Sequence, residues 1–180
     1  MRYFVAIPLP KSAQQTLQMI QPIATPDMRI IDAQQMHVTL HFLGELIDSQ
    51  FEAVRHAFSR IVHQQFQMSF CGVGRFPDVG HPTVLWAGVI PSSPLSALHD
   101  VLRVALTDEL GLQLDPRPFR PHVTLARCHP SSDEQSLATW LSQHDGVHFS
   151  TILVDRFVLY SSEFIDHKPK YIPVAEFALM

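Results

Sequence analysis

The chain has 180 residues, of which 46% are hydrophobic and 17% are charged, and its formal net charge at pH 7 is −4. This balance is typical of a globular protein and excludes a disordered chain. The negative charge also excludes a protein that grips long nucleic acid through many phosphates, so any nucleic-acid role would concern a short end held in one local site.

The first third of the chain alternates predicted strands and helices. β-Branched and aromatic residues at period two favour strands, and apolar residues three and four apart favour helices. The elements predicted in this part are, in chain order, a strand at 3–9, a helix capped by Ser12, a strand at 29–31, a strand at 36–43, and a helix from Asp48 or Ser49 to Ile61.

The rest of the chain mixes hairpins with two further helices. Gly, Pro and Asp mark the connections between the apolar runs. The elements predicted here are strands at 66–73 and 83–89 around a loop at 74–82, a helix at 95–110, a strand at 122–127, a helix from Ser132 or Asp133 to Leu141, and closing strands at 147–160 and 171–179 around a polar loop at 166–169.

This order of elements predicts an α+β fold. Helices that separate non-adjacent strands, with hairpins between them, favour mostly antiparallel sheets with helices on the outside. We expect a single bilobal domain over residues 1–180, whose two pseudo-symmetric lobes face each other across a groove.

One tetrapeptide occurs twice, as His37-Val38-Thr39-Leu40 and as His122-Val123-Thr124-Leu125. Both copies fall in predicted strands, at about 36–43 and 122–127. Side chains alternate between the two faces of a strand, so each copy presents its His and Thr on one face and its Val and Leu on the other. Two such strands would line one site with two imidazoles and two hydroxyls.

This set of side chains suits acid–base chemistry on a phosphate ester. The ordinary histidine pKa is near 6.5, so one copy can accept a proton while the other donates one, and threonine hydroxyls can hold phosphate oxygens. Such a site needs no metal, and it predicts a bell-shaped pH profile of kcat/KM around neutrality. The alternative is that each histidine is a half-exposed strand residue bonded to a neighbour.

The extended motifs add a family resemblance. The segments His37-Val38-Thr39-Leu40-His41-Phe42-Leu43-Gly44 and Arg120-Pro121-His122-Val123-Thr124-Leu125-Ala126-Arg127, together with the opening strand at 2–10, closely resemble the two-histidine phosphoesterase superfamily. Within it, the chain is most similar to the bacterial and archaeal RNA 2′,3′-cyclic phosphodiesterases, historically called 2′–5′ RNA ligases.

The resemblance implies a role for each matched residue. It places the family's functional side chains on His37 as general acid, His122 as general base, Thr39 and Thr124 as phosphate ligands, Phe42 as the aromatic that stacks on the terminal base, and Arg127 as a phosphate contact.

The implied activity is hydrolysis of RNA 2′,3′-cyclic phosphate ends to 2′-phosphomonoesters, with weak reverse ligation. We expect a cytoplasmic monomer without cofactor, metal or membrane partner, acting on RNA 3′ ends, short oligonucleotides or cyclic nucleotides. One alternative is an enzyme for small cyclic nucleotides, such as ADP-ribose cyclic phosphate. The other is a non-catalytic module that binds RNA ends.

Several further residues need an interpretation. His41 would share the face of His37 and is predicted to be a partly exposed surface residue. A zinc pair of these two histidines is disfavoured, because a strand would separate them by roughly 13 Å.

Trp86 and Trp140 are predicted to lie in the core. Arg75 and Phe76 begin the loop at 74–82, which is predicted to be a surface loop or a border of the groove, and Cys71 and Cys128 fit a reducing compartment.

Overall fold

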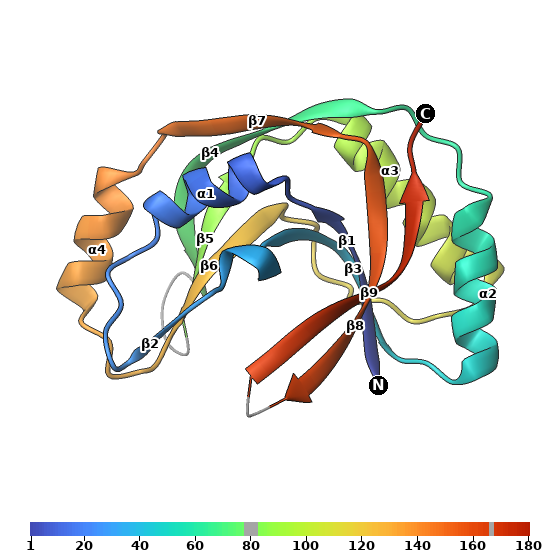
Figure 1. The fold of residues 1–180 in the computed structure, drawn as a ribbon, viewed down its shortest axis with the longest axis horizontal. Coiled ribbons are helices and arrows are strands. Elements are labelled where there is room, and N and C mark those ends of the chain that lie inside the picture. Colours follow the sequence, from blue (N-terminus) through green and yellow to red (C-terminus); the bar gives the residue numbers. More distant parts are fainter. Residues whose placement is uncertain (78–82, 166–167) are drawn as a thin grey trace.

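The computed structural model describes residues 1–77, 83–165 and 168–180. Parts of two predicted loops, residues 78–82 and 166–167, therefore lie outside the described residues. Nine strands in the described ranges form one curved sheet (Figure 1). They are β1 (Arg2–Pro8), β2 (Met28–Ile30), β3 (His37–Glu45), β4 (Phe66–Phe76), β5 (Thr83–Val89), β6 (His122–Cys128), β7 (His148–Val154), β8 (Arg156–Ile165) and β9 (Lys168–Ala178).

The sheet consists of two halves that meet at one residue pair. Its order is β7-β4-β5-β6-β3-β1-β8-β9, with β2 beside β6, and the strand pairs are antiparallel. We call β3, β1, β8 and β9 the first half-sheet, and β6, β5, β4, β7 and β2 the second. At their junction, Val38 of β3 pairs with Val123 of β6. The predicted α+β fold with mostly antiparallel strands is confirmed.

Helices cover the sheet on both sides of this junction. They are α1 (Lys11–Met19), α2 (Asp48–Ser59), α3 (Ser93–Val104) and α4 (Glu134–Gln143), with a 3₁₀ turn η1 (Ala33–Gln35) and a π-helical turn η2 (Ala105–Glu109). In Figure 1, α1 and α4 lie on one side of the molecule and α2 and α3 on the other. None of the helices within the described ranges has the length and apolarity needed to cross a bilayer.

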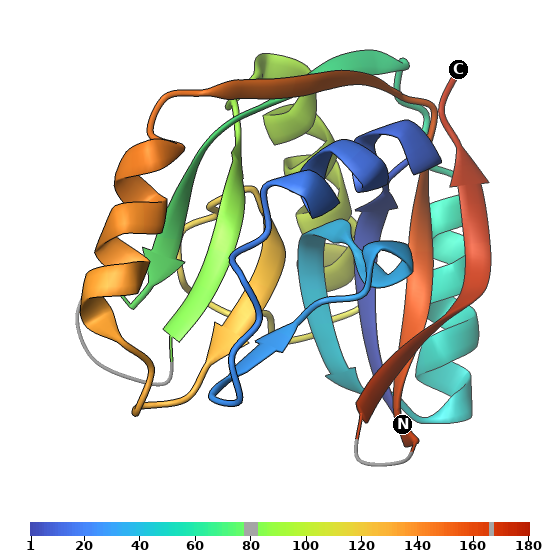
Figure 2. The ribbon, with the colours of Figure 1, turned by 60° about the vertical axis from the view of Figure 1, so that its left-hand side comes forward.

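Two helices reach the half-sheet that does not contain the strand before them. Helix α1 follows β1 but contacts β7, and α3 follows β5 but contacts β3 of the first half-sheet as well as β4 of the second. Figure 2 shows α1 crossing in front of the sheet to reach the side of α4. The indole N–H of Trp140 in α4 donates to the carbonyl of Ile20 at 2.9 Å, just beyond the end of α1. Trp140 is buried, as predicted.

Predicted helix starts were only partly right. Helix α1 has Pro10 at its N-cap and no side-chain cap, so the prediction for Ser12 is wrong. Helix α2 has Ile47 at its N-cap, so Asp48 lies inside the helix instead of capping it. Asp133 does cap α4, because its carboxylate accepts hydrogen bonds from the backbone N–H groups of the first turn.

The predicted long strand at 147–160 is wrong. It is two strands, β7 and β8, which separate at Asp155. Strand β7 pairs with β4 in the second half-sheet, whereas β8 pairs with β1 in the first. Local composition did not reveal this change of partner, because the segments on both sides of Asp155 and Arg156 are rich in β-branched and aromatic residues.

Candidate active site

Both motif strands contain a β-bulge at the same position. In the ladder between β1 and β3, Val5 pairs with His41 and Ala6 with Thr39, which leaves Leu40 without a partner. A bulge reverses the alternation of side chains beyond it. Accordingly, His41 is 7% exposed whereas Phe42 is 58% exposed. Phe42 therefore joins the face of His37 and Thr39, and His41 joins the core with Leu40.

The second motif repeats this arrangement. Leu85 of β5 pairs with Ala126 and Trp86 with Thr124, so Leu125 is the unpaired residue. Ala126 is fully buried and Arg127 is exposed. Arg127 therefore occupies, on the second strand, the position that Phe42 occupies on the first.

The junction of the half-sheets brings the two motifs together. Because β3 and β6 run antiparallel around the pair of Val38 with Val123, position 37 lies next to position 124 and position 39 next to 122. Both valines are fully buried on the opposite side. Each motif histidine thus lies beside the threonine of the other motif, on one face of the sheet.

Both motif histidines are held by the same kind of hydrogen bond. Nδ1–H of His37 donates to the carbonyl of Gln35 at 2.7 Å, and Nδ1–H of His122 donates to the carbonyl of Arg120 at 2.6 Å. A carbonyl only accepts, so Nδ1 must carry the proton and Nε2 is left for proton transfer. The Gln35 side chain donates to the carbonyl of Pro169 at 2.9 Å, which ties this support to β9.

Aromatic rings enclose the imidazole of His37. Phe4 lies 4.9 Å away, Tyr171 meets the ring edge-on at 5.2 Å, and Tyr160 lies at 6.1 Å. Phe4 is 3% exposed and stacks on Tyr160 at 5.2 Å. These contacts fix the ring and remove water from it. The sequence alone did not assign these three residues to the site, because they come from β1, β8 and β9.

Two other aromatic residues support His122. Phe76 meets its imidazole edge-on at 5.0 Å, and Trp86 lies at 6.2 Å. The expectation that Trp86 lies in the core is wrong, since it is half-buried beside Thr124 on the histidine face. Gly74 makes room for it, because a Cβ at this position would lie 2.1 Å from the indole ring. Phe76 ends β4 and borders the site.

The surroundings lower the pKa of both histidines. Burial lowers the pKa of His37 to about 4 against the opposing effect of the Gln35 carbonyl, and the charges of His122 and Arg127 lower it further. Burial and the charge of Arg127 likewise lower the pKa of His122. Both imidazoles are therefore neutral at pH 7 without substrate, and a bound phosphate anion would raise both pKa values.

His41 lies on the other side of the sheet, so the prediction of a partly exposed surface residue is wrong. Its Nε2–H donates to the carbonyl of His99 in α3 at 2.8 Å, and the two rings stack at 4.1 Å. Burial lowers the pKa of His41 to about 4. The bulge also separates His41 from His37, and no cluster of three or more possible metal ligands occurs within the described residues.

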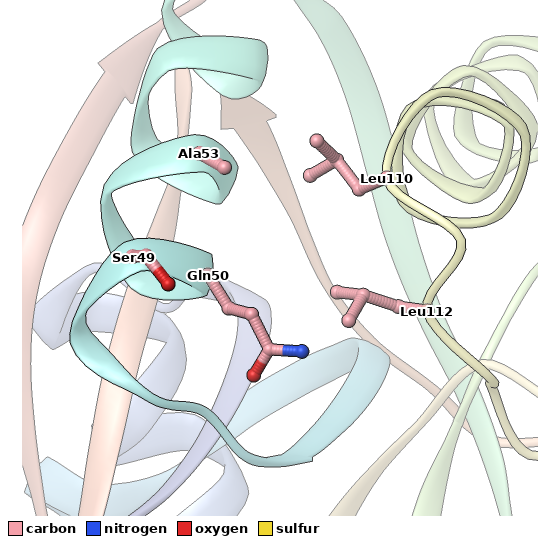
Figure 3. A pocket seen from close by; sticks show the side chains of 5 residues that line it. All are labelled: Ser49, Gln50, Ala53, Leu110 and Leu112. Atoms are coloured by element: carbon pink, nitrogen blue, oxygen red, sulfur yellow. The ribbon is translucent and has the colours of Figure 1, made fainter.

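Two hollows lie elsewhere on the surface. One, of about 120 Å³, lies between α2 and the segment after η2 and is lined by Ser49, Gln50, Ala53, Leu110 and Leu112, none of which is titratable (Figure 3). The other, of about 480 Å³, lies behind β3 around His99, Arg103 and Phe119. The second hollow is also lined by His41, whereas His37, Thr39, His122 and Thr124 line neither hollow.

Known proteins resemble this chain over nearly its whole length. The family model of the 2′-5′ RNA ligase superfamily matches residues 9–163. A protein of Archaeoglobus fulgidus named RNA 2′,3′-cyclic phosphodiesterase is 28% identical over 95% of this chain and 96% of its own length. One of the same name from Aquifex aeolicus is 32% identical, covering 83% of this chain and 80% of its own.

Solved structures agree with this similarity. The crystal structure of TT0787 from Thermus thermophilus superimposes with a TM-score of 0.84 at 26% identity, covering 99% of this chain and 97% of that one. The crystal structure of E. coli LigT in complex with 3′-AMP superimposes with a TM-score of 0.80 at 27% identity and the same coverage.

Proposed function

This chain belongs to the 2′-5′ RNA ligase superfamily, and on that basis we propose that it hydrolyses RNA 2′,3′-cyclic phosphate ends to 2′-phosphomonoesters. The observation that carries the proposal is the pair of imidazoles on neighbouring strands, each with Nδ1 bound to a carbonyl and with Nε2 bonded to none of the described residues. Relatives named RNA 2′,3′-cyclic phosphodiesterase support the same substrate.

In the proposed reaction, His122 accepts a proton from water as the water oxygen attacks phosphorus. The bond from phosphorus to the ribose 3′ oxygen breaks on the opposite side, and His37 donates its proton to that oxygen. The hydroxyls of Thr39 and Thr124 hold the non-bridging oxygens, where negative charge gathers in the transition state. Proton exchange with solvent then restores the starting protonation of the two imidazoles.

The difference between the two sides of the site supports this division of roles. Both histidines have aromatic neighbours, but on the side of His37 the ring of Phe42, 6.2 Å from Phe4, is 58% exposed, and an exposed aromatic ring suits a nucleoside. The leaving 3′ oxygen belongs to that nucleoside, so the acid should lie on the side of Phe42. Arg127, on the side of His122, offers a positive charge to the phosphate.

The isomer of the product tests the proposed function. The purified protein, in EDTA, should convert a short RNA that ends in 2′,3′-cyclic phosphate to one that ends in 2′-phosphate, since the mechanism uses only side chains. Chromatography against 2′- and 3′-phosphate standards identifies the isomer. A 3′-phosphate product, or a reaction that EDTA abolishes, would contradict the proposed mechanism.

The lowered histidine pKa values give a specific pH dependence. One imidazole must be protonated and the other neutral, so kcat/KM should peak below pH 6.5 and decline as rising pH removes the proton from the acid. The optimum of kcat should lie closer to neutrality, because the bound phosphate raises both pKa values. Measurements of kcat and kcat/KM from pH 4.5 to 9 check this dependence. If kcat and kcat/KM had the same optimum, above pH 7, the prediction would be contradicted.

Two alternatives make different predictions in the same assays. An enzyme for small cyclic nucleotides would prefer ADP-ribose cyclic phosphate to RNA ends, and a non-catalytic module would bind RNA ends without turnover. The two Nε2 atoms, without a hydrogen-bond partner in the part of the chain that the structure describes, favour an enzyme, because binding alone requires no proton transfer. Weak reverse ligation, a monomeric state and a cytoplasmic location remain predictions.

A further inference from the structure

Two arginines lie directly opposite each other on the face of the paired histidines. In the ladder between β2 and β6, Arg29 is the partner of Arg127. Directly opposed residues in such a ladder project from the same face, with Cβ atoms about 5 Å apart. Because the bulge at Leu125 places Arg127 on the face of His122 and Thr124, Arg29 shares this face at the border of the two half-sheets.

No carboxylate among the described residues neutralises either guanidinium. Ion pairs in these ranges hold several other arginines: Arg55, Arg60, Arg75, Arg117 and Arg156. Within the same ranges no ion pair joins Arg29 or Arg127, and both are exposed. Like charges opposed across a strand pair destabilise a sheet. In a chain whose net charge is −4, this pair concentrates positive charge beside the motif histidines.

The two arginines carry more positive charge than is needed to neutralise a single cyclic phosphate. The charge of Arg127 lowers the pKa of both His37 and His122, so its guanidinium lies within electrostatic reach of both. A cyclic phosphate between the imidazoles carries one negative charge, which Arg127 alone can neutralise. The guanidinium of Arg29, on the neighbouring strand β2, is then available to bind another anion.

We propose that Arg29, together with Arg127, holds a second phosphate of the substrate, the one on the 5′ side of the terminal nucleoside. The proposal rests on the proposed function, since it assumes a cyclic phosphate at the histidines. Every RNA end that carries a preceding nucleotide has this phosphate, and a cyclic nucleoside monophosphate lacks it. Planar guanidinium groups are well suited to phosphate oxygens. Arg29 thus makes the site prefer chain ends to free cyclic nucleotides.

The test compares two small substrates that differ by one phosphate: adenosine 2′,3′-cyclic phosphate and the same compound with a 5′-phosphate. For the wild type, the 5′-phosphate should raise kcat/KM about 10- to 100-fold, the range of a charged hydrogen bond. Arg29→Ala should remove most of this gain, and Arg29→Lys should keep part of it. Arg55→Ala, which removes an exposed arginine from α2, is the matched control and should keep the full gain.

Thermal unfolding separates this role from a structural one. Because Arg29→Ala removes a repulsion, its Tm should be no lower than that of the wild type. With a short RNA substrate, the slope of log kcat/KM against log salt concentration should also be shallower by about one for Arg29→Ala than for the wild type. Absence of a 5′-phosphate preference in the wild type, or an equal loss on both substrates in Arg29→Ala, would overturn the proposal.

Failure of the proposed function gives a different result. If the wild type hydrolyses neither these two compounds nor the short RNA that ends in 2′,3′-cyclic phosphate, the function is wrong, and calorimetric titration with the same two compounds decides on the second phosphate site. Tighter binding of the 5′-phosphorylated compound, lost in Arg29→Ala but kept in Arg55→Ala, would support the site. Equal affinities would reject it.

Discussion

Alanine at either motif histidine should lower kcat on a cyclic phosphate substrate by about 10²- to 10⁴-fold, the usual contribution of one general acid or base. The double variant His37→Ala/His122→Ala should be little worse than the more damaged single variant, because the two groups act in one step. His56→Ala on α2 is the control for an exposed histidine. Wild-type activity in either motif variant would remove that histidine from the mechanism.

A substrate with a better leaving group distinguishes the acid from the base. A nitrophenyl phosphodiester expels a stable anion that needs no protonation, so His37→Ala should lose far less activity on it than on a cyclic phosphate. His122→Ala should remain equally impaired on both, since water must still be activated. The opposite pattern would assign the acid to His122 and the base to His37.

Acidic pH should lower the free energy of unfolding, and His41 should account for a large part of this loss. The pKa of His41 is about 4 in the fold, against 6.5 for an unperturbed histidine. Between these values the unfolded chain binds a proton that the folded chain does not, so the free energy of unfolding falls as pH falls from 6.5 towards 4. The contribution of this one residue is about 3 kcal/mol, as an order of magnitude.

Denaturant titrations at pH 7 and pH 4.5 measure this effect. His41→Gln keeps an N–H donor for the carbonyl of His99 but does not titrate, so its loss of stability on acidification should be smaller than that of the wild type. His37 also has a lowered pKa and will contribute in both proteins. The exposed His56→Gln is the control; an equal loss in His41→Gln and wild type would show that His41 is not the source.

The sequence was sufficient to predict the motif strands, the antiparallel sheet and a helix start at Ser132 or Asp133, since each depends on local patterns. It could not predict the side of His41, because strict alternation places it with His37 and only the unpaired Leu40 reverses it. Nothing local marks a bulge when every residue around it is a good strand former.

Local sequence patterns could not predict the surroundings of the motif histidines either. Phe4, Tyr160 and Tyr171 meet His37 only through pairing between distant strands. Trp86 reaches the histidine face because Gly74 on the next strand leaves space for its indole. Arg29 becomes notable only when β2 is seen to pair with β6. Each of these facts depends on strand register, which is a property of the assembled sheet.

The strand order also has a consequence for the time course of synthesis. Strand β1 leaves the ribosome before its two neighbours in the sheet, β3 and β8, and β8 begins only at Arg156. Until β8 has been made, β1 can pair only with β3. Helix α1 likewise cannot pack against β7 until β7 has been made. The nascent chain must therefore keep an apolar strand with one open edge until β8 has been translated, a period in which association with other chains competes with folding.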